Sequence, residues 1–142
     1  VNVSSVAGVI AIPYQAFYSA TKAAVLSLTD ALRNEVRPFG VEVSAVLPGD
    51  VKTSFTSSRR KNREEGAYAA FAENSVKVME KDEREGMSAA YAAKKIFICA
   101  TKRKMPHVRV VGGKYRFLCF VAAVMPRRLR DWLLFKIYGG KK

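Results

Sequence analysis

The sequence is poor in the residues that form metal sites and disulfide frameworks. Its 142 residues include one histidine and two cysteines, Cys99 and Cys119, which lie 20 positions apart within apolar stretches. This spacing matches neither a metal motif nor a disulfide framework, so we expect no metal site, two buried inert thiols and a reducing compartment, by default the cytoplasm. The lone histidine, His107, is expected to be structural or exposed.

The last third of the chain nearly lacks acidic residues. Residues 94–142 contain fourteen basic residues and a single acidic one, Asp131, whereas residues 1–58 and 59–93 are each neutral. The whole formal charge of +13 therefore lies in a terminal segment, where it favours an anionic partner. A run of nine uncharged residues ends at Pro126 and is too short to span a membrane, because a spanning helix needs about 20 apolar residues.

Hydrophobic residues make up 49% of the chain, which excludes a disordered tail. Residues 1–3 are expected to end a buried strand, and neither a methionine nor a signal peptide precedes them. We therefore expect the C-terminal portion of a longer protein. Apolar residues then recur at helical spacing over 15–37, and residues 41–47 are largely β-branched. The resulting strand, helix and strand predict a βαβ unit in an α/β fold with a parallel sheet.

Residues 53–86 are polar and charged, which predicts a mobile insertion outside the core. Two weak helical stretches are expected within it, at about 64–71 and 74–81. Its larger apolar side chains fit a substrate lid and plain packing equally well: Tyr68, Phe71 and Met79.

The chain beyond the insertion is expected to return to regular structure. Ser88 is expected to cap a helix that runs to about Thr101, and residues 108–111 to form a short strand. Residues 114–138 have helical periodicity, with a break at Pro126. We therefore divide the chain into the C-terminal part of an α/β domain over 1–113, with its insertion at 53–86, and a basic amphipathic extension over 114–142.

One set of polar side chains is suited to proton transfer. Tyr18 and Lys22 are four residues apart in the predicted long helix, so their side chains rise from one face, about 6 Å apart along the axis. An ammonium at this distance favours a phenolate, which lets a tyrosine exchange a proton near neutral pH. Ser5 follows the first strand at its carboxyl end, where open parallel sheets bind ligands. A Tyr–Lys pair alone is common by chance, so a surface pair without function stays an alternative.

The order of the surrounding motifs resembles the short-chain dehydrogenase/reductase family. The segments that carry the resemblance are N-V-S-S-V-A-G at 2–8, Y-S-A-T-K at 18–22, L-R-N-E-V at 32–36 and L-P-G-D-V-K-T at 47–53. They cover residues 1–55, and beyond them the likeness is architectural. The resemblance implies the C-terminal part of a Rossmann-like, doubly wound parallel sheet with a C-terminal helical extension.

The resemblance also implies a role for each residue that matches a family motif. Tyr18 is the general acid and base, and Lys22 holds the ribose hydroxyls of the cofactor beside it. Ser5 orients the substrate carbonyl and stabilises its developing charge, whereas Ser4 is the weaker candidate. Further cofactor contacts are expected from the loop after the second strand, at Pro48, Gly49, Val51 and Thr53.

The sequence departs from the family by lacking parts of it. There is no T-G-x-x-x-G-x-G phosphate loop, no N-N-A-G strand and no residue placed to choose between NADP and NAD. NADP is the preferred cofactor, with NAD as the alternative. We expect the 142-residue chain neither to bind a dinucleotide tightly nor to turn over substrate by itself. Micromolar affinity for NADPH would contradict this expectation.

The resemblance implies that the full-length protein is an NAD(P)-dependent oxidoreductase, which moves a hydride between nicotinamide and a carbonyl or secondary alcohol. The basic, apolar extension resembles those of relatives that act on lipids, steroids or retinoids at membranes, so a hydrophobic small-molecule substrate is preferred. In this family the long helix commonly pairs subunits, which implies a homodimer.

The extension itself has two open interpretations. Basic and apolar residues alternate in it, as in a helix that lies in a membrane interface: Arg127, Arg128, Leu129, Arg130, Trp132, Leu133, Lys136, Ile137, Lys141 and Lys142. Alternatively, its apolar face covers the substrate pocket or a partner subunit. The first interpretation supports a second hypothesis, a basic membrane-surface module with vestigial catalytic residues. Nucleic acid ranks well below membrane as a partner, because the aromatic residues lie in apolar helical runs.

Overall fold

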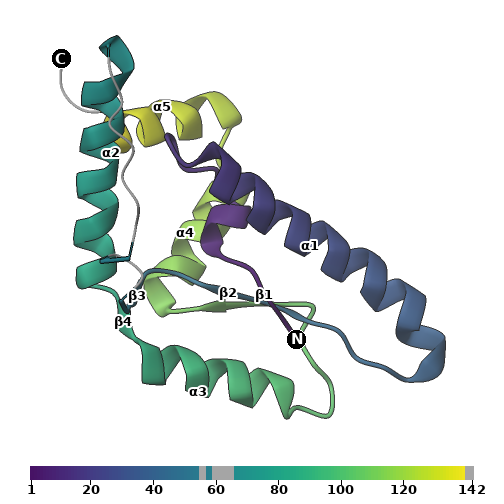
Figure 1. Ribbon diagram of the computed structural model, residues 1–142. Coiled ribbons are helices and arrows are strands. Elements are labelled where there is room, and N and C mark those ends of the chain that lie inside the picture. The colour runs from purple at the N-terminus through teal and green to yellow at the C-terminus, as the bar shows by residue number, and fades with distance from the viewer. Residues whose placement is uncertain (55–56, 59–65, 140–142) are drawn as a thin grey trace.

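A parallel sheet of three strands forms the frame of the molecule. The computed structural model describes residues 1–54, 57–58 and 66–139. The strands lie in the order β1 (Asn2–Val3), β2 (Ala45–Pro48) and β5 (Val108–Val111). Helix α1 packs on one face of this sheet and helix α3 on the other (Figure 1). Because both faces of the central strand are covered, its residues Ala45, Val46 and Leu47 are fully buried.

The predicted βαβ unit is present, with a shorter second strand than expected. Helix α1 (Ala16–Val36) joins β1 to β2 and is followed by the 3-10 turn η2 (Arg37–Phe39). Residues 41–44 are not in a strand, although 41–47 was the expected range. The reason is the register, since Asn2 of β1 and Val108 of β5 both pair first with Ala45. Before that point, residues 41–44 are outside the register, and the main-chain oxygen of Ser44 accepts a 2.9 Å hydrogen bond from the N–H of Asn2.

The insertion holds one long helix, where two weak stretches were expected. Helix α2 (Ala67–Arg84) is continuous, and its residues Ser75 and Met79 are buried. The expectation that the whole insertion lies outside the core was therefore wrong, because packing on one face of α2 stabilises a helix of weak intrinsic propensity. Glu64 and Glu65, where the first stretch was expected to begin, lie outside the described residues.

Two short parallel strands pair at the base of the insertion. They are β3 (Val51–Lys52) and β4 (Met87–Ser88), and Val51 is opposite Met87. Each has only two residues, which is too short for any periodic pattern in the sequence. The pair brings the two ends of the insertion together beside the end of β2.

Helix α3 (Ala89–Ala100) begins as the sequence predicts. The Ser88 hydroxyl accepts a hydrogen bond from the main-chain N–H of Tyr91 at 3.2 Å, which caps the helix. Near the other end of the helix, Cys99 is buried in a core cluster with Val46 and Val111. The expected buried thiol of Cys99 is therefore confirmed.

The extension consists of two helices that meet at Pro126, as expected. Helix α4 (Gly113–Val124) follows β5, and helix α5 (Arg127–Tyr138) packs against α2 (Figure 1). The Asn74 amide of α2 donates a hydrogen bond to the main-chain oxygen of Tyr138 at 3.2 Å. Cys119 of α4 is only half-buried, and this burial raises the pKa of its thiol. In the part of the chain that the structure describes, no helix has the length and apolar character needed to cross a membrane.

Candidate active site

Tyr18 and Lys22 lie together near the start of α1. The Lys22 Nζ is 5.8 Å from the centre of the Tyr18 ring. It also donates a hydrogen bond, 3.3 Å long, to the main-chain oxygen of Val3 at the end of β1. This hydrogen bond holds the ammonium toward the carboxyl edge of the sheet, at an exposed position. Tyr18 is 38% exposed, so a ligand can reach it.

The two serines after β1 have different environments. Ser4 is buried, and its hydroxyl donates to the main-chain oxygen of Lys22 at 2.8 Å, which pins the end of β1 to α1. Ser5 is half-buried, and its hydroxyl accepts a 3.1 Å hydrogen bond from the N–H of Ala7. Within the described residues, no hydrogen bond joins Ser5 to Tyr18. Ser5 is therefore the more accessible serine, and Ser4 is a structural contact.

Gly8 lets the loop of residues 4–8 pack against the main chain of α1. This loop carries Ser4 and Ser5 and is called the serine loop below. The 3-10 turn η1 (Val6–Gly8) packs against α1. A Cβ atom on Gly8 would lie 2.9 Å from the main-chain carbon and oxygen of Lys22, and 3.0 Å from the Ser4 Oγ. A side chain at this position would push the loop away from the helical turn that carries Lys22.

The loop of residues 48–53, which is predicted to contact the cofactor and is called the cofactor loop below, lies beside these residues. Pro48 ends β2, and Val51 begins β3, while Thr53 follows β3 and is exposed. Because β1 and β2 are adjacent and parallel, their carboxyl ends place this loop next to the serine loop. The main-chain oxygen of Asp50 accepts a 2.9 Å hydrogen bond from the N–H of Met87, which anchors the loop to β4.

A contact that the sequence does not predict, between Tyr115 and Asp50, holds this loop from the other side. The Tyr115 hydroxyl of α4 donates a 2.6 Å hydrogen bond to the Asp50 carboxylate, and its ring lies against Gly49. Burial raises the pKa of Tyr115, and the hydrogen bond to Asp50 raises it further. Nothing in the sequence links two positions 65 residues apart, so no local pattern predicts this contact.

Helix α2 rests on the segment that precedes the Tyr18 helix. The Ser75 hydroxyl donates to the main-chain oxygen of Pro13 at 3.1 Å. Nearby, the rings of Tyr14 and Tyr68 lie 5.1 Å apart. The insertion is therefore placed next to the candidate site, with Met79 buried in packing and Tyr68 exposed.

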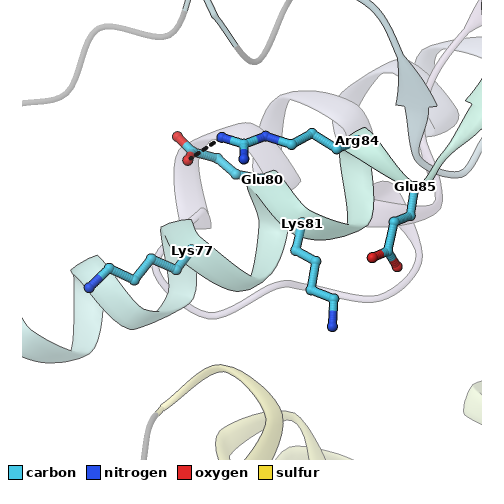
Figure 2. Close-up of a pocket in the computed structure, with 5 residues that line it drawn as sticks. All are labelled: Lys77, Glu80, Lys81, Arg84 and Glu85. Atoms are coloured by element: carbon cyan, nitrogen blue, oxygen red, sulfur yellow. Dashed lines mark ion pairs between the residues drawn. The ribbon is translucent and has the colours of Figure 1, made fainter.

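A surface hollow on α2 is lined by charged side chains and lies apart from the Tyr18–Lys22 pair in composition. Figure 2 shows its lining, which consists of five charged side chains from α2 and the residue after it: Lys77, Glu80, Lys81, Arg84 and Glu85. Arg84 and Glu80 form an ion pair at 3.6 Å. This charged lining does not suit a hydrophobic substrate.

The lone histidine is also outside the candidate site. His107 is exposed, and its Nε2 lies 2.8 Å from a carboxylate oxygen of Asp30 on α1. This confirms the expectation of a structural or exposed residue. Across the described ranges, no cluster of three histidine, cysteine or acidic side chains is arranged to hold a metal ion.

A Tyr–Lys pair on the helix between two parallel strands, with a serine at the end of the first, defines a Rossmann-like protein with a site suited to proton transfer. The family model described as short chain dehydrogenase matches residues 1–64. A 3-ketodihydrosphingosine reductase from Bacteroides thetaiotaomicron is 45% identical over 89 residues, which is 61% of this chain and 33% of the relative. A short-chain dehydrogenase from Penicillium ochrochloron is 33% identical over 98% of this chain and 51% of the relative.

Solved structures have the same fold. A short-chain dehydrogenase from Burkholderia cenocepacia in complex with NADP matches 94% of this chain and 46% of its own with a TM-score of 0.67 and 22% identity. A short-chain dehydrogenase/reductase from Burkholderia phymatum in complex with NAD matches 99% of this chain and 50% of its own, with a TM-score of 0.68 and 23% identity. The chain belongs to the short-chain dehydrogenase/reductase family. It spans at most about half the length of these relatives.

Proposed function

We propose that the protein carrying this chain is an NAD(P)-dependent oxidoreductase that moves a hydride between nicotinamide and a carbonyl or secondary alcohol. The observation that carries the proposal is the placement of the Lys22 ammonium, 5.8 Å from the Tyr18 ring and hydrogen-bonded to the end of β1. In this proposal Tyr18 gives a proton to the carbonyl oxygen, or takes it from the alcohol. Ser5 holds the same oxygen by a hydrogen bond.

The residues around Tyr18 have the donors that a nicotinamide cofactor requires. Lys22 has three N–H donors, of which one is bonded to Val3, so others are available to ribose hydroxyls. Main-chain groups of Pro48, Gly49 and Val51 and the Thr53 hydroxyl would hold the nicotinamide end. When bound, the cofactor supplies or accepts the hydride. NADP is our first choice and NAD the alternative, and family structures in complex with each support a nicotinamide cofactor.

A hydrophobic substrate, lipid-like or steroid-like, fits the surroundings of the site. Helix α2 brings the apolar ring of Tyr68 against Tyr14, four residues before Tyr18. A 3-ketodihydrosphingosine reductase is among the similar proteins, which supports a ketone on a long apolar chain as the kind of substrate to test first.

The substitution Tyr18→Phe tests the enzymatic proposal. In the natural protein that carries this chain, it keeps the ring beside Lys22 and removes the proton donor. We expect kcat for NADPH-linked reduction of a long-chain ketone to fall by about 100-fold or more. Tyr91→Phe, an exposed tyrosine on α3, is the matched control. If Tyr18→Phe reduces the ketone as fast as the wild type does, Tyr18 is not the proton donor and the proposal fails.

A second candidate function is attachment of the extension to an anionic membrane surface in the cytoplasm. Helix α5 turns Leu133 and Leu134 inward and exposes its opposite face. That face joins apolar and basic side chains: Arg128, Leu129, Trp132, Phe135 and Lys136. The Lys136 Nζ lies 4.2 Å from the centre of the Trp132 ring. Large apolar side chains among cations are typical of helices that lie in a lipid headgroup region.

Helix α4 adds a second exposed apolar stripe. Phe117, Phe120 and Val124 recur at helical spacing and are each about two-thirds exposed, at 67%, 65% and 68%. Arg116 lies next to this stripe and is exposed as well. Of the residues expected to add charge to the extension, Lys141 and Lys142 lie outside the described residues.

The single tryptophan of the chain reports directly on this candidate function. Trp132 lies on the exposed face of α5, so its emission is expected to shift to the blue with vesicles that contain anionic lipid. In co-sedimentation, Arg128→Gln with Lys136→Gln is expected to weaken binding about 30-fold, at about 1 kcal/mol for each charge. The control is Lys94→Gln with Lys95→Gln on α3, which removes the same charge elsewhere. Equal binding to neutral vesicles would remove the electrostatic part of the proposal.

A further inference from the structure

The Tyr115 ring is packed between two glycines at the base of the extension. A Cβ atom on Gly49 would lie 2.2 Å from this ring, and one on Gly112 would lie 2.8 Å from it. Gly112 has a φ of 97°, which side-chain-bearing residues rarely adopt, and it directly precedes α4. The chain therefore turns sharply after β5, and this turn places the ring of Tyr115 against Gly49 and Asp50.

The Asp50 side chain and main chain are held by different elements. Its carboxylate accepts the Tyr115 hydroxyl at 2.6 Å, and its main-chain oxygen accepts the N–H of Met87 at 2.9 Å. A Cβ atom on Gly86 would lie 2.5 Å from that same oxygen, so the residue before β4 also approaches the turn at main-chain distance. The turn is thus fixed by α4 on one side and β4 on the other.

Other polar groups from α2 and α5 face this turn. Burial raises the pKa of Asp82 on α2, and the charge of Asp50 raises it further, while Lys114 opposes the rise. Burial also raises the pKa of Tyr138 on α5, with Asp82 and Asp50 adding to the effect. Within this partly buried cluster, Tyr115 donates a hydrogen bond to the Asp50 carboxylate, a charge-assisted contact stronger than a bond between neutral groups.

We propose that Tyr115 is a positioning residue, which fixes the Gly49–Asp50 turn and so couples the extension to the cofactor loop. The predicted effect on cofactor binding rests on the proposed function. When the Tyr115 hydroxyl is lost, the turn opens more often and the loop binds nicotinamide less tightly. The proton chemistry of Tyr18 is unaffected, because neither residue contacts the other. The expected signature is therefore a raised KM for the cofactor at constant kcat.

The first test measures the loop and needs no activity. Tyr115→Phe keeps the ring between the glycines and removes only the hydroxyl. Amide hydrogen exchange at residues 51–53 and at Met87, whose N–H bonds to Asp50, is expected to become about tenfold faster. Asp50→Asn keeps an oxygen acceptor and is expected to have a smaller effect than Asp50→Ala. Exchange no faster than in the Tyr91→Phe control would overturn the proposal.

The second test uses the natural protein that carries this chain. Tyr115→Phe is expected to raise KM for NADPH about fivefold to tenfold, with kcat within about twofold of the wild type. An unchanged KM together with faster loop exchange would also overturn the proposal, because the coupling to the cofactor would be absent. Failure of the proposed function is distinguishable, since it appears as full activity of Tyr18→Phe and leaves the exchange result as it is.

Discussion

At the scale of single residues, the candidate site depends on a position with no side chain. Gly8 packs against the main chain of Lys22, and the two atoms that a Cβ would approach most closely are backbone atoms of Lys22 that cannot rotate away. We expect Gly8→Ala to lower the free energy of unfolding by about 1 to 3 kcal/mol, through overpacking. Urea denaturation measures this change.

Gly113→Ala is the control for that substitution. Gly113 begins α4, has no atom within 4 Å of its Cβ position and has no positive φ. Alanine at this position is expected to be neutral or to stabilise by up to about 1 kcal/mol. Equal destabilisation by both substitutions would contradict the role given to the close approach at Gly8.

Some residues of the site are predictable from the sequence and others are not. The four-residue spacing of Tyr18 and Lys22 places both on one helical face, and the structure brings them together. The resemblance favours Ser5 over Ser4 as the substrate contact, and the structure shows Ser4 buried and hydrogen-bonded to the main chain of Lys22. Tyr115 and Asp50 meet only through the packing of α4 on the loop, so no local signal reveals them.

At the scale of elements, local signals predicted where several elements begin or end, but not the length of β2 or of α2. Ser88 and Pro126 mark helix ends in the structure as they do in the sequence. The extent of β2 depends instead on how far its neighbours reach, and the register that begins at Ala45 is a tertiary property. Helix α2 likewise gains its length from packing, as the burial of Met79 indicates.

Docking of α5 on α2 is expected to weaken at high pH. Burial raises the pKa of Tyr138 to about 12, whereas the unfolded chain ionises at the ordinary value of 10.0. Between these values the folded protein keeps a proton that the unfolded chain loses, so stability falls as pH rises from about 10 to about 12. We expect Tyr138→Phe to avoid about 1 to 2 kcal/mol of this loss, allowing for partial exposure.

Urea unfolding at pH 8 and pH 11, followed by Trp132 fluorescence, measures the effect, since Trp132 lies on the same helix. Tyr68→Phe removes an exposed tyrosine and serves as the control. If the free energy of unfolding falls equally between pH 8 and pH 11 in the wild type and in Tyr138→Phe, the prediction is contradicted.

At the scale of the whole molecule, the sequence predicts the parallel α/β architecture because each connection is local. Residues 1–48 contain a complete βαβ unit, and such a unit permits few arrangements. The contact between α2 and α5 joins segments far apart in the chain, with 64 positions between Asn74 and Tyr138, so the sequence alone does not indicate how the insertion and the extension meet.

A homodimer through α1 stays a prediction at this scale. Helix α1 exposes Phe17 and Leu28, at 91% and 61%. If copies of the protein pair through this helix, Leu28→Glu is expected to raise the dimer dissociation constant at least about tenfold, because a charge would be buried in an apolar contact. Phe39→Glu is the control, since Phe39 is 79% exposed but lies beyond α1. Sedimentation velocity measures both, and equal effects would argue against pairing through the helix.

The parallel pairing of β3 with β4 has a consequence for how such proteins diversify. Val51 and Lys52 pair with Met87 and Ser88, so the two ends of the insertion meet at a neck formed by these strands. Helix α2 also contacts the rest of the molecule beyond this neck, through Ser75 to Pro13 and through Asn74 to Tyr138, so a segment from a relative is expected to fit where these two contacts are kept. Chimeras cut at this neck offer a direct way to transplant substrate preference between relatives while the proton-transfer apparatus is kept.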